Sequence, residues 1–112
     1  MAAVVANDIE SVRLVLDHGA DVNAQNHVKL TALMAAVLAG NLDVSELLLD
    51  NKADVNAEDE LGMTVLMAAI QLGRSDMANL LLNYNADVNA KDKGGSTALM
   101  YAMVCYGQYG YF

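Results

Sequence analysis

Hydrophobic and polar positions follow one another along the chain in blocks that return every 33 residues. Each block has a Thr, an Ala-rich apolar stretch, a Gly, a Leu-rich stretch and a polar segment. The polar motif ADVNA stands at residues 20–24, 53–57 and 86–90. The motifs TALM, TVLM and TALM stand at residues 31–34, 64–67 and 97–100. A period of this size indicates stacked structural repeats rather than one irregular globule.

The two apolar stretches of each block predict two short helices, here called the first and the second helix of a repeat. The first helices are expected to begin at Thr31, Thr64 and Thr97. A Thr hydroxyl there can accept a backbone N–H of the first turn, which has no partner within the helix. Gly40 and Gly73 should end these helices, because Gly reaches the left-handed conformation without strain. The second helices should then start near Asn41 and Arg74.

Helices of two or three turns are marginal in water, so each repeat must bury its apolar face on the next one. The expected result is an all-α, quasi-linear stack held by nearest-neighbour interfaces. Short Asp and Asn side chains in the polar segment can bond to nearby backbone and shape the turns between repeats. We therefore predict a single domain over residues 1–112, divided into a partial repeat 1–25, full repeats 26–58 and 59–91, and a partial repeat 92–112.

Composition narrows the class of protein. A chain of 112 residues with 55% hydrophobic residues can bury a core, which argues against disorder. Its net charge of −8 disfavours nucleic acid, which needs a basic surface. No stretch approaches the roughly 20 apolar residues of a membrane span, and the start lacks the features of a secretory signal. Cys105 is the only cysteine, which suits a reducing compartment, so a cytoplasmic location is expected.

These motifs, over about residues 1–107, resemble the ankyrin repeat family. The Thr-x-Leu start, the Ala-Ala pair, the Gly between helices, the Leu-Leu-Leu run and ADVNA all agree with it. The resemblance implies a solenoid of helix–turn–helix units with β-hairpin fingers projecting roughly perpendicular to the helices. The family's usual His of each first helix is replaced by Met34, Met67 and Met100. We expect these Met side chains to contribute packing only.

A second departure follows the second helix, where the family usually has Gly. Gly19 keeps it, whereas Lys52 and Asn85 replace it in the later repeats. Asn tolerates a left-handed conformation, but a Lys there should cost on the order of 1 kcal/mol.

The two ends depart from the repeat pattern. Ala2–Ala6 and Ile9–His18 are expected to form the two helices of the first partial repeat. At the other end Gly107 falls one residue late, and aromatic residues gather at Tyr101, Tyr106, Tyr109, Tyr111 and Phe112. Either the chain is cut from a longer array or these aromatics cap the last helix. Both alternatives leave apolar surface on the terminal repeats, so weak self-association is expected.

No group of residues predicts catalysis or a cofactor. His18 and His27 occupy non-equivalent places, and Cys105 has no evident base nearby in the sequence. The string DVNAEDE at 54–60 begins like a calcium loop, but Asp59 and Val65 stand where Gly and Glu are needed. We therefore predict neither an enzyme nor a metal site.

The resemblance to the ankyrin family instead implies a partner-binding surface, on the concave face made by finger tips and first helices. Its residues here would be His27, Val28, Leu30, Leu38, Glu58, Glu60, Leu61, Met63, Gln71, Leu72, Tyr84, Lys91 and Lys93. Several are apolar although they lie on turns. Two interpretations stay open: a tolerant surface whose fingers pack on one another, or an apolar strip framed by charge that suits a helical or extended peptide.

Three functions are therefore considered. The first is a non-catalytic protein–protein interaction module that binds a protein or a peptide with a basic or apolar segment. The second is a structural spacer in a larger ankyrin-repeat protein, with no ligand of its own. The third is a substrate role, because Leu-rich helices before DVNA resemble substrates of an asparaginyl hydroxylase. That resemblance puts modification at Asn23, Asn56 and Asn89.

Overall fold

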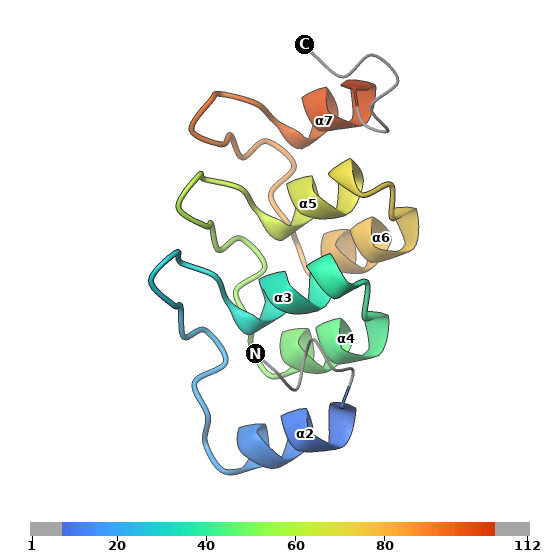
Figure 1. Ribbon diagram of the computed structural model, residues 1–112. Helices are drawn as coiled ribbons and strands as arrows, with labels where there is room; N and C mark the ends of the chain where they lie inside the picture. Colours follow the sequence, from blue (N-terminus) through green and yellow to red (C-terminus); the bar gives the residue numbers. More distant parts are fainter. Residues whose placement is uncertain (1–7, 105–112) are drawn as a thin grey trace.

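The computed structural model describes residues 8–104, and this part of the chain forms a stack of short helices (Figure 1). The helices are α2 Ile9–Asp17, α3 Ala32–Ala39, α4 Leu42–Asp50, α5 Val65–Gln71, α6 Ser75–Asn83 and α7 Ala98–Val104. Corresponding helices begin 33 residues apart, and the predicted helix pairs of the two full repeats are confirmed by α3 with α4 and α5 with α6. The predicted helix Ala2–Ala6, Cys105, Gly107 and the aromatic residues from Tyr106 onward lie outside the described residues.

The helices form two columns. The first helices α3, α5 and α7 pack on one another in sequence, and α2 packs on α4 in the column of second helices, which α6 continues (Figure 1). Within each full repeat, α3 packs on α4 and α5 on α6. The molecule is elongated, with extents of 44 × 24 × 23 Å. Each interior repeat is therefore stabilised by contacts with its two neighbours, as expected of a solenoid.

The Thr residues cap the first helices as predicted. The Thr31 Oγ1 accepts the backbone N–H of Met34 at 3.2 Å. In the same way, Thr64 accepts the N–H of Met67 and Thr97 accepts the N–H of Met100. The expectation that Met contributes packing only is wrong at Met34, because its sulfur accepts the backbone N–H of Thr31 at 3.3 Å. Thr31 and Met34 thus cap the start of α3 reciprocally.

The second helices α2 and α4 each begin with a side-chain cap. Asp8 accepts the N–H of Ser11, and Asn41 accepts the N–H of Val44, both at 3.1 Å. Arg74 holds the equivalent position before α6 and makes no such bond. Its guanidinium instead packs over Gly40, where an added Cβ would lie 2.4 Å from the Arg74 Cζ. Gly40 is favoured here by its left-handed φ of 73°, whereas the flexible Arg74 side chain could move away from an added Cβ.

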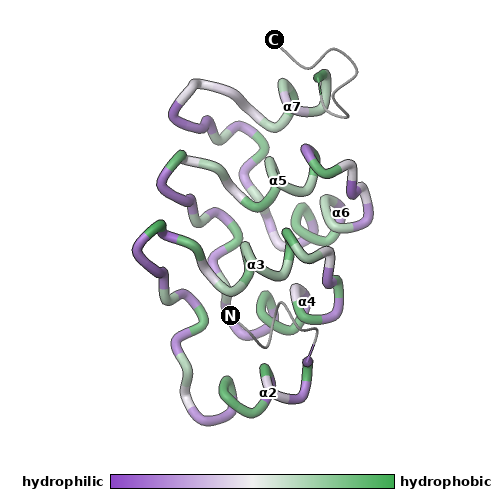
Figure 2. The backbone as a smooth tube through the Cα atoms, in the orientation of Figure 1, coloured by the Kyte–Doolittle hydropathy of each residue, from purple (hydrophilic) through white to green (hydrophobic). Residues whose placement is uncertain are grey.

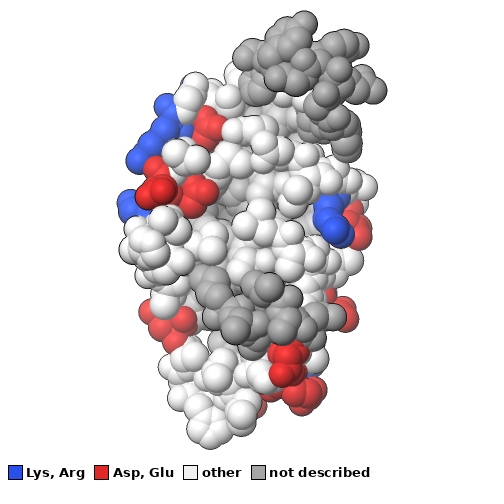
Figure 3. All heavy atoms as spheres, viewed as in Figure 1, with Lys and Arg blue, Asp and Glu red and all other residues white. Residues whose placement is uncertain are grey.

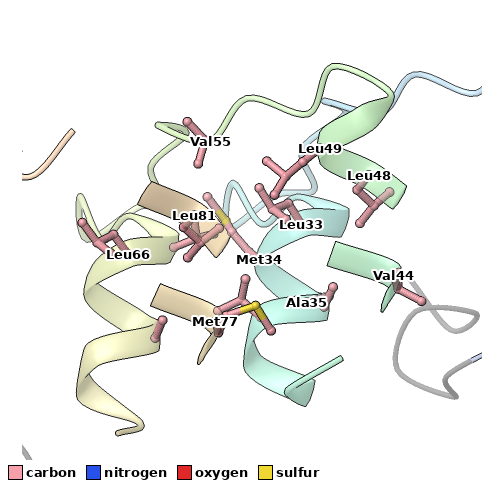
Figure 4. Packing of buried hydrophobic residues seen from close by; sticks show 14 of the residues in the cluster. Leu33, Met34, Ala35, Val44, Leu48, Leu49, Val55, Leu66, Met77 and Leu81 are labelled. Carbon is pink, nitrogen blue, oxygen red and sulfur yellow. The ribbon is translucent and has the colours of Figure 1, made fainter. Parts of the chain in front are cut away.

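The core runs between the two columns. The hydrophobic stretches of the chain coincide with the helices, while the segments between them are largely hydrophilic (Figure 2). Close up, Met77 and Leu81 of α6 lie between Leu66 of α5 and Leu33 of α3 (Figure 4). All four side chains are fully buried. Burial of each such side chain is worth about 1.5–3 kcal/mol, which a helix of seven to nine residues cannot obtain alone.

The two polar residues of the ADVNA motif have different roles: the Asp bonds within its own turn, and the Asn bonds to the next repeat. In each copy the Asp carboxylate accepts the N–H of the Asn two residues later, at 2.9 Å, as Asp21 does from Asn23. The Asn then bonds to the next repeat. The Asn23 Oδ1 accepts the N–H of Asp54 at 2.7 Å, and the Asn56 Oδ1 accepts the N–H of Asp87 at 2.8 Å. The Asp shapes the turn and the Asn joins it to its neighbour.

The second residue after each second helix is left-handed, as the sequence predicts. The φ angles of Gly19, Lys52 and Asn85 are 90°, 76° and 69°. Lys52 is therefore a non-Gly residue held in a conformation that its Cβ opposes.

We expect Lys52→Gly to stabilise the protein by up to about 1 kcal/mol, because the Cβ clash disappears. For a domain of this size that raises the melting temperature by a few degrees, on the order of 4 °C. Thermal unfolding followed by circular dichroism measures it. Asn85→Gly is the matched control and should gain less, since Asn tolerates this conformation. An unchanged or lower melting temperature for Lys52→Gly would contradict the assignment.

A buried hydroxyl offers a second test of the core. The Ser45 Oγ in α4 is buried and has no hydrogen-bond partner, and Ala78 stands at the equivalent place in α6. An unsatisfied buried polar group costs about 1–3 kcal/mol. Ser45→Ala should therefore raise the free energy of unfolding by about 1 kcal/mol in urea denaturation. Ser75→Ala makes the same change at an exposed position and should have little effect. A loss of stability in Ser45→Ala would show that the hydroxyl is bonded.

Candidate interaction surface

Three fingers project from the stack on one side, at residues 26–30, 59–63 and 92–96 (Figure 1). Each is closed by a backbone bond from the N–H of its first residue to the carbonyl of its last, at 3.0–3.1 Å. No strand is found in residues 8–104, so the β-hairpin form predicted for the fingers is not confirmed. Each finger is a tight turn of five residues, too short to extend a ladder of hydrogen bonds.

One side chain organises each finger. Asn26, Asp59 and Asp92 each accept two backbone N–H groups of their own finger at 2.9–3.0 Å through Oδ1. These residues were not among the predicted site residues, although their 33-residue spacing was a signal that could have revealed them. The fourth residue of each finger, Lys29, Gly62 or Gly95, has a positive φ.

Neighbouring fingers are bonded to each other. The N–H of Glu60 donates to the carbonyl of Val28 at 3.3 Å, and the N–H of Lys93 donates to the carbonyl of Leu61 at 3.0 Å. At Gly62 an added Cβ would lie 2.9 Å from the Lys93 nitrogen, so the close approach requires Gly. The predicted residues on the fingers thus belong to one continuous ridge.

A hollow of about 90 Å³ lies between this ridge and the first helices α3 and α5. It is lined by Leu30, Met34, Leu38, Asp59, Met63, Thr64, Val65, Ala68 and Gln71. Four predicted site residues, Leu30, Leu38, Met63 and Gln71, are brought together here. Leu38 is exposed at the end of α3, and the walls are mostly apolar.

The other predicted residues lie outside the hollow. Leu61 and Leu72 are exposed, and Val28 is half-buried on its finger. The charged and polar residues on the fingers or directly before them are all exposed, namely His27, Glu58, Glu60, Lys91 and Lys93. Tyr84 is placed differently: it follows α6 in the column of second helices, and its hydroxyl donates to Asp50 at the end of α4. Tyr84 therefore joins two second helices and does not line the hollow.

Charge gathers along the fingers. Acidic and basic side chains lie side by side on the finger edge of the molecule, while the surface over α3 and α5 shows little charge in the same view (Figure 3). The acidic group is Glu58, Asp59 and Glu60, and the basic group is Lys91 and Lys93. Within residues 8–104 the one ion pair within 4.0 Å joins Arg13 to Glu10, so the finger charges face solvent. The apolar hollow is therefore bordered by charged side chains that are accessible to a partner.

Tyr101 ties the second and third fingers to α7. Its hydroxyl donates to the Asp92 Oδ2 at 2.6 Å and lies 3.2 Å from the Met63 sulfur. The hydrogen bond to Asp92, with smaller effects of burial and of nearby carboxylate charge, raises the pKa of Tyr101 to about 12. The same bond, together with backbone N–H groups of the finger, lowers the pKa of Asp92. Neither residue's role was predicted from the sequence.

The asparagines predicted as hydroxylation sites lie at the junctions between repeats. The side chains of Asn23 and Asn56 both bond to the following repeat. They would have to leave those bonds to enter an enzyme's active site. Modification at Asn23, Asn56 and Asn89 stays a prediction.

Comparison with known proteins decides the family. A family model described as ankyrin repeats in three copies matches residues 1–92 and 59–111. The chain belongs to the ankyrin repeat family. Ankyrin repeats are generally protein–protein interaction modules and are typically not enzymes. A search of curated proteins finds no match to the chain.

Two further findings concern the described part of this ankyrin stack. Over residues 8–104, none of the helices has the length and apolar character needed to cross a bilayer. In the same region no three His, Cys, Asp or Glu side chains come together in a way that could hold a metal ion.

The Tyr101–Asp92 bond gives a prediction about pH. The raised pKa of Tyr101 contributes stability below its ordinary value of 10.0, and that stability is lost as the pH rises through about 12. The lowered pKa of Asp92 contributes stability above its ordinary value of 3.8, and that stability is lost as the pH falls through the folded-state value. In Asp92→Asn the pKa of Tyr101 should fall toward 10.0.

Tyrosinate absorbance during alkaline titration measures this change. The variant should keep its third finger, because Asn26 already makes the same two backbone bonds as an amide in the first finger. Tyr101→Phe identifies the tyrosine responsible, since it should remove the high-pH step from the wild-type curve. Identical titration curves for wild type and Asp92→Asn would contradict the bond.

Proposed function

We propose that the chain is a non-catalytic interaction module that binds a protein or peptide on the surface formed by the fingers and the first helices. The observation that carries this proposal is the apolar hollow between α3, α5 and the finger ridge, framed by exposed charge. Hot spots of protein interfaces are typically apolar anchors in a pocket, surrounded by a polar rim.

The size of the hollow supports a peptide side chain as its ligand. Pockets for drug-sized molecules measure roughly 300–1,000 Å³, and an apolar cavity of about 150 Å³ holds benzene. A hollow of about 90 Å³ is smaller than either and suits one aliphatic side chain. Glu60 on the adjacent finger and Glu58 directly before it favour a basic residue beside that anchor. We therefore propose a partner segment with an apolar anchor flanked by positive charge. The proposed setting is the cytoplasm, because a single cysteine suits a reducing compartment.

The test compares affinity capture by the wild type and a Leu38→Ala/Leu61→Ala variant in the native host. Both leucines are exposed, so the variant should keep its helicity and melting temperature. Met63 is avoided because its sulfur lies beside the Tyr101 hydroxyl. Loss of two contact leucines should weaken binding of the purified partner by at least about tenfold, since each is worth roughly 1 kcal/mol or more.

The matched control is Leu14→Ala, an equally exposed leucine on α2, far from the hollow along the stack. It should bind the partner as the wild type does. Equal retention of the partner by the double variant would contradict the proposed surface. If the wild type retains nothing specific, the spacer alternative is favoured instead.

A further inference from the structure

The hollow between the finger ridge and helices α3 and α5, here called the finger hollow, has a counterpart one period later. Two of the residues that line the finger hollow are Asp59 and Ala68. The residues 33 positions further along the chain are Asp92 and Tyr101. The carboxylate is thus kept in the third finger, while the methyl group on α5 is replaced by a phenol on α7. The two places therefore differ in whether the chain supplies a phenol beside the carboxylate.

In the later place the phenol is bonded to the finger. The Tyr101 hydroxyl donates to the Asp92 Oδ2 at 2.6 Å and lies 3.2 Å from the Met63 sulfur. Asp92 and Met63 are the counterparts of Asp59 and Leu30, which both line the finger hollow. The Tyr101 side chain therefore reaches into the place that corresponds, one repeat later, to the finger hollow.

The carboxylates of the second and third fingers are held in the same way. In both, Oδ1 accepts the backbone N–H groups of the residues two and four positions later, at 2.9–3.0 Å. Because these bonds correspond, the second oxygens of Asp59 and Asp92 have corresponding directions. Within residues 8–104, Tyr101 donates to the Asp92 Oδ2, whereas no donor reaches the Asp59 Oδ2. The first finger differs from both, because Asn26 is neutral.

The size of the finger hollow determines how a ligand can enter it. At about 90 Å³ it is too small to enclose a whole aromatic ring, since a cavity of about 150 Å³ holds benzene. An aliphatic side chain fits by volume, but it would remove water from Asp59 without offering a donor in return. A phenol that enters hydroxyl first meets both conditions. Its hydroxyl can reach the carboxylate while the rest of its ring lies against Leu38, which is exposed in the same wall.

We propose that the finger hollow binds a tyrosine side chain of the partner, whose hydroxyl donates to the Asp59 Oδ2 as that of Tyr101 donates to Asp92. This inference rests on the proposed function, because it names the anchor of the segment that binds there. A hydrogen bond to an ionised carboxylate is shorter and stronger than one between neutral groups. Tyrosine is therefore favoured over phenylalanine, which has the same ring but no donor.

The first experiment needs no partner. Ala68→Tyr reproduces in the second repeat the arrangement of the third, so the new phenol should bond to Asp59. Its pKa should then rise above the ordinary value of 10.0, as measured by tyrosinate absorbance during alkaline titration. Leu14→Tyr adds the same phenol to exposed surface of α2 and should titrate near 10.0. An added tyrosine in Ala68→Tyr that titrates as it does in Leu14→Tyr would overturn the proposal.

The second experiment uses acetylated, amidated tripeptides Lys-X-Lys, in which X is Tyr, Phe, Leu or Lys. Each is titrated into the intact protein and followed by the NMR shifts of backbone amides. The Tyr peptide should bind at least about tenfold more tightly than the Phe peptide, because it alone of the two offers a donor to a charged acceptor. Ala68→Tyr should lose this binding, because its own phenol fills the hollow.

Asp59→Asn tests the acceptor. The variant should keep its finger, because Asn26 makes the same two backbone bonds in the first finger. Its preference for the Tyr peptide over the Phe peptide should disappear. Asp43→Asn, the same change at an exposed position of α4, should keep the preference. A preference for Tyr that persists in Asp59→Asn would show that the phenol binds elsewhere.

The outcomes separate this inference from the proposed function. If the Leu or the Lys peptide binds as tightly as the Tyr peptide, the tyrosine anchor is rejected, although the surface itself still binds a peptide. If none of the four peptides binds, the tyrosine anchor is rejected as well. The proposed surface is then judged by the capture experiment with the Leu38→Ala/Leu61→Ala variant alone.

Discussion

Burial between neighbouring repeats is the interaction on which the rest of this structure depends. Helices of seven to nine residues do not persist alone in water. Met77 and Leu81 of α6 become core residues only because α3 and α5 stand one period apart and close over them. The 33-residue spacing is therefore the register that lets each apolar face meet the next one. A change of spacing would expose these faces at every junction.

The polar segments keep that register and also produce the interaction surface. Asn23 and Asn56 each bond to the backbone of the following ADVNA segment, which fixes the distance between repeats. The same distance brings Glu60 to Val28 and Lys93 to Leu61 on adjacent fingers. Because the fingers are held both by their own Asx turns and by each other, the finger hollow is a product of stacking. A single repeat would not form it.

The repeated features were the predictable ones. The Thr caps, the left-handed Lys52 and the burial of Leu48 and Leu81 follow from local chemistry and the period. The family resemblance indicated four residues of the hollow. The contacts that were missed, such as the Tyr101–Asp92 bond and the Met34 sulfur at Thr31, depend on how individual side chains turn, which a pattern of residue types does not encode. The bond of Tyr84 to Asp50, which spans two repeats, was not predicted either.

Helix α7 connects the packing of the helices to the finger ridge. Helix α7 packs on α5. It also carries Tyr101, which holds the third finger through Asp92 and contacts Met63 of the second. Loss of the packing of α7 on α5 would therefore also release the anchor of the finger ridge, so the end of the stack influences the surface along its side.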